Sequence, residues 1–322
     1  MTDARRVIFR LIEIFSRSTV WMIIFIFAIL RLAGIELKIS AQITIALIAL
    51  LIGIPHGAID HLISMPSQPR GRFALYIAVY IAIAVIAGWM IATWNVLGFQ
   101  LILIMSSLHF GYGDAAYRNE WKEVAGRKKS SWRIESLYAI PAGFVPVILP
   151  LTDPRSGDAL HRIHPSLQSW AGGNSHTLRW VTLVLAAIAI VILAVRWSFA
   201  FAIDLTLLTA LALIAPPLVA FATYFGAWHA ARHTARLTLK LPRATKLALE
   251  GHGLRALWAA IFPGLYAVAG TALVAIGLML FDRSGFSSGL LWSTLVVIWA
   301  LTVPHMLTTS RFDWRAITVS RG

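Results

Sequence analysis

Apolar runs of about 20 residues recur along the chain, and they constrain its fold more than any other feature of the sequence. A helix needs about 20 apolar residues to cross the ~30 Å hydrocarbon core of a bilayer. The 322 residues are 58% hydrophobic and 13% charged, with a mean hydropathy of +0.75, whereas soluble domains carry roughly 25% charged residues. The sequence therefore excludes a soluble fold and predicts an all-α, polytopic integral membrane bundle.

The breaks between apolar runs divide the chain into about ten expected transmembrane helices, with eight as the lower count. We expect a basic cytoplasmic arm over 1–18, a single transmembrane domain over 19–310 and a short cytoplasmic tail over 311–322. The expected spans are approximately 19–36, 39–62, 73–95, 97–117, 134–151, 177–195, 198–215, 217–237, 256–281 and 289–309.

The net charge of +14 serves as a test of topology. In a soluble protein it would suggest nucleic acid, but membrane proteins concentrate Lys and Arg in their cytoplasmic loops. With ten spans and the N-terminus inside, most of the 28 Lys and Arg residues fall on the cytoplasmic side. We therefore expect both termini in the cytoplasm, contact with the lipid bilayer and no nucleic-acid partner.

The chain has no cysteine. Structural disulfides, iron–sulfur clusters and thiolate-ligated haem are thereby excluded. A bound metal would have to be held by His, Asp or Glu side chains.

Histidines are the most informative residues, because ionisable side chains inside membrane spans are costly and usually mark a function. Five of the ten histidines lie well inside expected spans, and all five are on spans that run from outside to inside. They lie about 12 to 17 residues from the outer helix ends, or about 18–26 Å at ~1.5 Å per residue. These depths are compatible with one site that contains His56, His109, His229, His233 and His305.

His229 and His233 are separated by four positions, so a helix presents both rings on one face. A single membrane histidine is often only a hydrogen-bonding partner between helices. A group of neutral imidazoles at one depth instead favours iron, copper or zinc, since magnesium and calcium prefer oxygen ligands. We expect no catalytic residue beyond such a metal centre.

Carboxylates near the histidines have two interpretations. Asp60 follows His56 by one helical turn, where it could orient a ligand imidazole or be a residue at the helix end. Together with His61, it is assigned to the residues that support the ligands. Asp204 is expected to be buried, and Asp114 and Glu135 are expected to be solvated near the interface.

Aromatic residues accompany two of the histidine motifs. They could line a tunnel for a long, flat, apolar substrate, or simply face lipid and packed neighbours. The tunnel candidates are Phe110, Tyr112, Tyr224, Phe225 and Trp228.

Three motifs carry a resemblance to a known family. They are Pro55-His56-Gly57-Ala58-Ile59-Asp60-His61, Leu108-His109-Phe110-Gly111 and Trp228-His229-Ala230-Ala231-Arg232-His233. In this order, on a polytopic chain of this length, they resemble the Brp/Blh family of bacterial and archaeal membrane β-carotene dioxygenases. The resemblance covers the second to the tenth span.

This resemblance implies an Fe²⁺ enzyme that uses O₂ to cleave the central 15,15′ double bond of β-carotene into two molecules of retinal. The family's iron ligands correspond to His56, His109, His229 and His233, with His305 as a possible additional ligand. The implied location is the inner (cell) membrane of a prokaryote, with a retinal-binding opsin as a possible partner.

Two other readings remain open from the residues alone. A membrane di-iron desaturase or hydroxylase of lipid or carotenoid also uses histidine motifs, but it needs about eight histidine ligands and typically an adjacent His-His pair, which this chain lacks. A transporter or a bis-histidine haem protein could use the same residues for proton relay or porphyrin binding.

Overall fold

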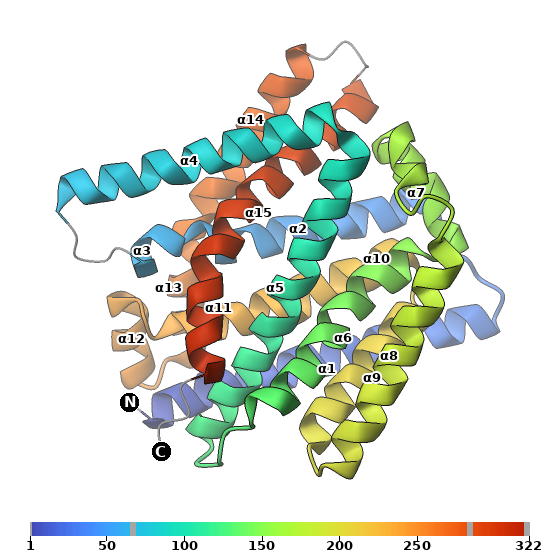
Figure 1. The fold of residues 1–322 in the computed structure, drawn as a ribbon. Helices are drawn as coiled ribbons and strands as arrows, with labels where there is room; N and C mark the ends of the chain where they lie inside the picture. Colours follow the sequence, from blue (N-terminus) through green and yellow to red (C-terminus); the bar gives the residue numbers. More distant parts are fainter. Residues whose placement is uncertain (1, 65–68, 282–285, 319–322) are drawn as a thin grey trace.

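The computed structural model describes residues 2–64, 69–281 and 286–318, and over these ranges the chain is helical without any strand. Figure 1 shows the long helices packed side by side as a bundle. The long helices are α1 (Thr2–Leu32), α2 (Ile39–Ala58), α4 (Arg70–Thr93), α5 (Asn95–Val124), α6 (Trp132–Leu151), α8 (Ser175–Val195), α9 (Phe199–Ile214), α14 (Leu265–Phe281) and α15 (Phe286–Thr318).

Shorter helical segments connect or continue these long helices. They are α3 (Asp60–Ser64), η1 (Pro154–Ser156), α7 (Gly157–Ile163), η2 (Pro165–Ser169), α10 (Pro217–Thr223), η3 (Tyr224–Ala230), α11 (Ala231–Thr238), α12 (Pro242–Leu249), α13 (Gly253–Ile261) and η4 (Phe262–Gly264).

Eight helices of the described chain are long and apolar enough to cross a membrane. The expected all-α polytopic bundle of eight to ten spans is thus confirmed. Of the remaining two expected spans, 198–215 corresponds to α9, which has only 16 residues. The other, 217–237, is a helical run whose middle is the π-helical segment η3.

The ends of the chain lie together in space. Figure 1 shows the start of α1 and the end of α15 at the same end of the bundle, near α12. The loop between α5 and α6 is at this end as well, and it carries Arg127, Lys128 and Lys129. The start of α1, the end of α15 and a basic loop therefore share one side of the bundle.

The first helix is longer than the expected span of 19–36, because it begins at Thr2. Residues 2–18 of the expected basic arm form the first half of α1, and they pack against the rest of the protein. Phe9 stacks on Tyr117 of α5 with 5.1 Å between the ring centroids, and Arg5 pairs with Glu120 at 3.0 Å. Ile8, Phe9 and Ile12 are thus buried.

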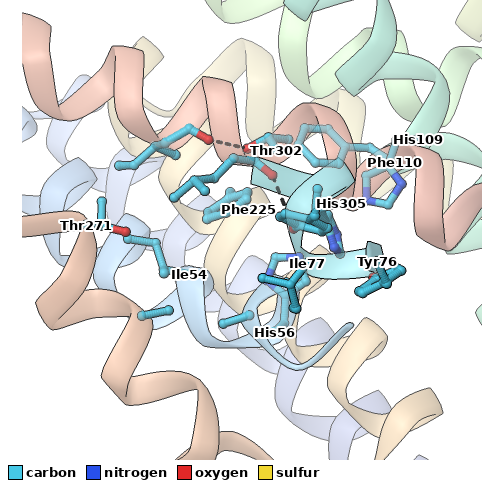
Figure 2. Close-up of a pocket in the computed structure, with 16 residues that line it drawn as sticks. Ile54, His56, Tyr76, Ile77, His109, Phe110, Phe225, Thr271, Thr302 and His305 are labelled. Carbon is cyan, nitrogen blue, oxygen red and sulfur yellow. Dashed lines mark hydrogen bonds between the residues drawn. The ribbon is translucent and has the colours of Figure 1, made fainter. Parts of the chain in front are cut away.

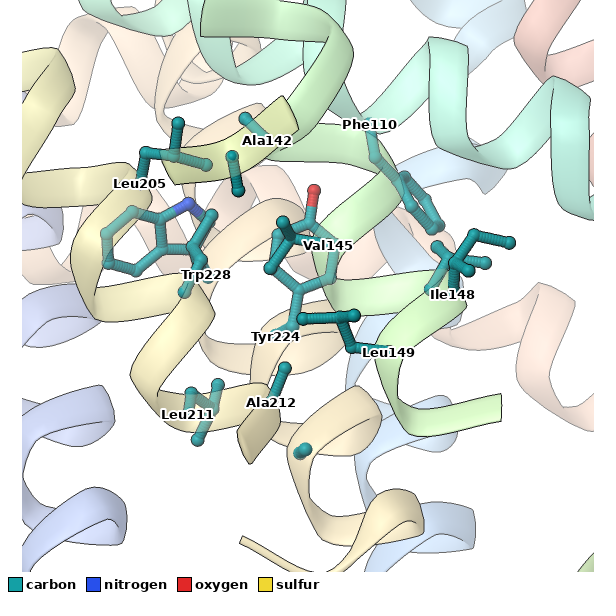
Figure 3. Packing of buried hydrophobic residues seen from close by; sticks show 14 of the residues in the cluster. Phe110, Ala142, Val145, Ile148, Leu149, Leu205, Leu211, Ala212, Tyr224 and Trp228 are labelled. Atoms are coloured by element: carbon teal, nitrogen blue, oxygen red, sulfur yellow. The ribbon is translucent and has the colours of Figure 1, made fainter. Parts of the chain in front are cut away.

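The core lies between α5, α6, α9 and α10. Glycines allow α5 and α6 to approach closely, because a Cβ on Gly111 would overlap the Ala139 carbonyl and one on Gly143 would overlap that of Ser107. Such small residues are typical of helix contacts in membranes. Figure 3 shows side chains of α6 and α9 packed around Tyr224 and Trp228.

A buried group of charged residues, which we call the ionic cluster, joins α1, α5, α9 and α11. Asp204 is fully buried, as expected, and Arg17 and Arg232 approach its carboxylate at 2.8 and 3.0 Å. Arg118 pairs with both Asp204 and Glu13, and Glu13 also pairs with Arg17. The desolvated charges therefore have partners, as burial requires.

Candidate metal centre

The five histidines that the sequence singled out come together inside the bundle. His56 is on α2, His109 on α5, His229 on η3, His233 on α11 and His305 on α15. All five are buried, with at most 8% of any residue exposed. Helices that are far apart in the chain thus deliver five imidazoles to one place.

The five rings have a definite arrangement. Four of them form a closed circuit in the order His56, His229, His109, His305, with successive ring centroids 5.7, 5.0, 5.1 and 5.1 Å apart. His233 lies 5.3 to 6.2 Å from every member of this circuit. The five ring centroids therefore lie close together, with the four of the circuit as a base and His233 as an apex.

Ring spacing and nitrogen chemistry together test whether these residues fit a metal. Imidazoles that share one ion at ~2.1 Å have ring centroids about 4.5–5.3 Å apart, so the observed circuit is at or slightly above this distance. Among the described residues, no three His, Asp or Glu side chains are arranged to hold an ion as they stand. Both ring nitrogens of His229 and of His233, and Nε2 of His109, nevertheless have no hydrogen-bond partner within the described part of the chain. Buried imidazole nitrogens left in this way fit a metal, once the rings turn slightly inwards.

The π-helical segment η3 sets the position of His229. Its seven residues, Tyr224–Ala230, precede the α-helical turn that carries His233. The two rings lie 6.0 Å apart and are nearly parallel, with an interplanar angle of 25°. Segments of π-helix are rare and occur frequently at functional sites.

Asp114 lies behind His229, which corrects the expectation that it is solvated near the interface. Only 1% of this residue is exposed. Its Oδ2 accepts hydrogen bonds of 3.1 Å from the Tyr224 hydroxyl and from Trp228 Nε1. Its Oδ1 lies 3.7 Å from His229 Nδ1.

Glu135 is the second correction of this kind, since it is fully buried on α6. Both of its carboxyl oxygens are without a hydrogen-bond partner among the described residues.

A different carboxylate, which belongs to none of the histidine motifs in the sequence, lies behind His109. Asp313 Oδ2 is 3.9 Å from His109 Nδ1, and Asp313 also pairs with Arg236 at 2.5 Å. The Thr309 hydroxyl is closer to the same His109 nitrogen, at 3.3 Å. Thr309 and Asp313 follow His305 by one and two helical turns on α15, a spacing that would have indicated them.

Asp60 and His61 were assigned to the residues that support the ligands. Their backbone belongs to α3, but their side chains lie outside the part of the chain that the structure describes.

An apolar cavity of about 230 Å³ adjoins the histidines. Figure 2 shows His56, His109 and His305 beside it, with Ile77 and Tyr76 of α4 nearby. Residues of α14 and α15 complete its wall. The imidazoles therefore border a space that an apolar molecule can enter.

A second cavity, of about 170 Å³, lies beside the first, next to the first halves of α2 and α5. The two share Phe110, Phe225, Ile298 and Thr302, and we call these four residues the neck. A third cavity of about 1030 Å³ meets the first two at Ile298 and extends along α2, α14 and α15 to α7. Apolar space thus continues on both sides of the neck.

The five candidate tunnel aromatics fall into different places. Phe110 and Phe225 belong to the neck, and Phe110 lies 4.5 Å from the His229 ring. Tyr112 lines a separate hollow beside His109. Tyr224 and Trp228 are fully buried and donate to Asp114, so they support the histidines from behind.

The three histidines of the 152–176 segment lie elsewhere. His161 and His176 are exposed, and His176 Nε2 accepts a hydrogen bond from Trp180. His164 packs its ring 4.6 Å from that of Trp292.

Comparison with known proteins gives one match. The sequence model of a family described as beta-carotene 15,15′-dioxygenase matches residues 47–313. This range includes all five clustered histidines as well as Asp114 and Asp313. No curated protein and no solved structure matches the chain.

Proposed function

The chain belongs to the beta-carotene 15,15′-dioxygenase family, and from that premise we propose that it cleaves the central double bond of β-carotene with O₂ to give two molecules of retinal. The observation that carries the proposal is the meeting of five buried imidazoles beside apolar cavities. No acid or base needs to act on the substrate, because the reaction starts from a hydrocarbon.

We propose Fe²⁺ as the cofactor, with His56, His109, His229 and His233 as its ligands and His305 as the candidate for a fifth. When bound, iron would supply the redox chemistry that allows O₂ to react with the polyene. The protein's own contribution is a set of neutral nitrogen donors, held on five helical segments and shielded from water.

The surroundings of the histidines suit an apolar substrate. β-Carotene has no polar group and dissolves in the hydrocarbon region, so access from the bilayer is the simplest route. Tyr76, Ile77 and Tyr80 of α4 line the first cavity. Only 6% of the most apolar stretch of α4 is buried inside the protein. A substrate entering past this lipid-facing helix would reach His56 and His305 without crossing water.

The neck supports cleavage near the middle of a long molecule. Phe110 and Phe225 separate apolar space on two sides, and both rings lie within 6 Å of a clustered histidine ring. A polyene that passes the neck would extend one half into each side. Its central bonds would then lie beside the imidazoles.

Expression in a β-carotene-producing bacterium tests the proposal. We expect the pigment to disappear and retinal to form, both measured by chromatography. Central cleavage predicts that all aldehyde products have the same chain length. Lasting colour in cells that contain folded, iron-loaded protein would contradict it. Aldehydes of two different chain lengths would still indicate a dioxygenase but would contradict cleavage at the central bond.

Iron content separates this proposal from a di-iron desaturase or hydroxylase. One ring cluster predicts one iron per chain, and two irons would favour the di-iron class. A Soret absorption band from the purified protein would instead indicate haem.

A further inference from the structure

Asp114 is a buried carboxylate with one oxygen engaged and one oxygen free. Tyr224 and Trp228 both donate to Oδ2, each at 3.1 Å. Oδ1 has no hydrogen-bond partner among the described residues. An unpaired carboxylate oxygen is costly inside a protein, so a second role for it is expected.

The free oxygen faces His229. Asp114 Oδ1 lies 3.7 Å from His229 Nδ1, and the structure, where it is described, gives that nitrogen no hydrogen-bond partner either. The gap exceeds a normal N–H···O hydrogen bond by only about 0.5–0.8 Å. The two bonds to Oδ2 hold the carboxylate in place, so a small turn of the imidazole ring is enough to close the gap.

We infer that Asp114 is a positioning residue that orients the His229 ring by accepting a hydrogen bond from its Nδ1–H. With the proton on Nδ1, the lone pair of Nε2 is available to a metal. This inference rests on the proposed metal site but not on the identity of the substrate. It also explains why Tyr224 and Trp228, two of the aromatics nearest His229 in sequence, are not in the walls of the cavities.

The other nearby carboxylate is less suited to this role. Asp313 is paired with Arg236, and it lies 3.9 Å from His109 Nδ1, farther than the Thr309 hydroxyl. Glu135 is as buried as Asp114, but within the described residues the carboxylates paired with a clustered histidine are Asp114 and Asp313. Asp114 alone, among these three, combines a fixed carboxylate with a free oxygen directed at an imidazole.

Binding of Co²⁺ to the metal-free, full-length protein in detergent tests the inference. Asp114→Asn should weaken Co²⁺ affinity by about 10–100-fold, because loss of such an outer partner typically has this effect. It should also alter the visible absorption of bound Co²⁺. Glu135→Gln, which neutralises an equally buried acid, should leave both the affinity and the spectrum unchanged.

A second variant covers the case in which Asp114→Asn does not fold. Tyr224→Phe removes one of the two hydrogen bonds that hold the carboxylate, so it should weaken Co²⁺ binding relative to the wild type. If a folded Asp114→Asn binds Co²⁺ like the wild type, or if Asp114→Asn does not fold and Tyr224→Phe binds Co²⁺ like the wild type, the inference is overturned. Equal losses in Asp114→Asn and Glu135→Gln would also overturn it, since they would reveal a general effect of buried charge.

Failure of the proposed reaction gives a different result. If the wild type binds Co²⁺, Asp114→Asn weakens binding and no retinal forms, the inference stands and the proposed reaction fails. If the wild type forms retinal and Asp114→Asn leaves Co²⁺ affinity unchanged, the reaction stands and the inference fails. A wild type that binds no metal would overturn the inference.

Discussion

Arg232 Nη1 donates a hydrogen bond of 3.0 Å to Asp204 Oδ2, and this bond ties the histidine motif of α11 to α9. Arg232 lies between His229 and His233 in sequence. Its guanidinium carbon also lies 3.5 Å from the centre of the Trp228 ring. The ionic cluster therefore fixes the backbone that carries two of the clustered histidines.

Removal of Asp204 should destabilise the whole bundle. Asp204→Ala leaves Arg118 and Arg232 buried with less negative charge beside them, and the loss of one partner from such a group typically costs ~3–5 kcal/mol. The loss in the free energy of unfolding can be measured in detergent, with circular dichroism as the probe.

The matched control is Asp158→Ala, which removes an exposed aspartate from α7. It should change the free energy of unfolding by less than ~0.5 kcal/mol. Equal stability of the two variants would show that the ionic cluster contributes no net stability.

Loss of a clustered histidine should remove bound iron. We expect alanine at 56, 109, 229 or 233 to abolish both iron content and retinal formation, because each change removes one donor from the site. His161→Ala and His176→Ala should leave both nearly intact, since these residues are exposed. Iron analysis of the purified variants, beside retinal yield, gives the comparison.

His305 is the informative intermediate case. If His305 binds iron, His305→Ala should lose the metal. If it only packs within the cluster, the variant should retain iron and lose ~1–2 kcal/mol of stability at most. Iron and activity like those of the wild type in both His229→Ala and His233→Ala would contradict the proposed ligand set.

The common depth of the clustered histidines is the feature of the site that could best be predicted from the sequence. Helix rise converts residue counts into depth, so His56, His109 and His305 could be compared although they are far apart in the chain. Depth does not indicate which way a ring points. The circuit of four rings with His233 as the apex required the packing of the helices.

Asp114 was placed wrongly for an identifiable reason. The apolar run suggested that the fourth span ends near 117, whereas α5 continues to Val124. The end of α5 is polar in sequence, but Asp114 contacts Tyr224 and Trp228 of η3. Arg118 pairs with Glu13 of α1 and Asp204 of α9, so both residues are buried. Hydropathy describes the contact of a helix with lipid, and it does not detect polar residues that pack against another helix.

The π-helical segment η3 and the burial of α1 were also beyond sequence reasoning. Nothing in Tyr224–Ala230 distinguishes π-helix from α-helix by composition. Positive charge near the N-terminus predicted which side of the membrane it occupies, but not that Arg5 and Arg17 would pair with Glu120 and Asp204.

Membrane topology can be tested by reporters at defined positions. Tags at the N-terminus, at the C-terminus and in the 125–131 loop should report the cytoplasm, because these segments share one basic end of the bundle. A tag in the 164–174 segment should report the outside. A cytoplasmic signal from the latter, or an external signal from a tag at Lys128, would contradict the predicted orientation.

Gly53→Ala should impair the reaction through the neck, and this change tests the proposed path of the substrate. A Cβ at position 53 would overlap the ring of Phe225, which must then shift towards His56 or into the cavities. We expect retinal formation to fall roughly 10–100-fold, as it does when reacting groups are misplaced by about 1 Å. Gly277→Ala on α14 is the matched control, since a Cβ there meets no atom of the described residues within 4 Å. Adding Phe225→Leu to Gly53→Ala should restore much of the lost activity by removing the overlap, and a double variant as impaired as Gly53→Ala would rule out the Phe225 ring as the cause.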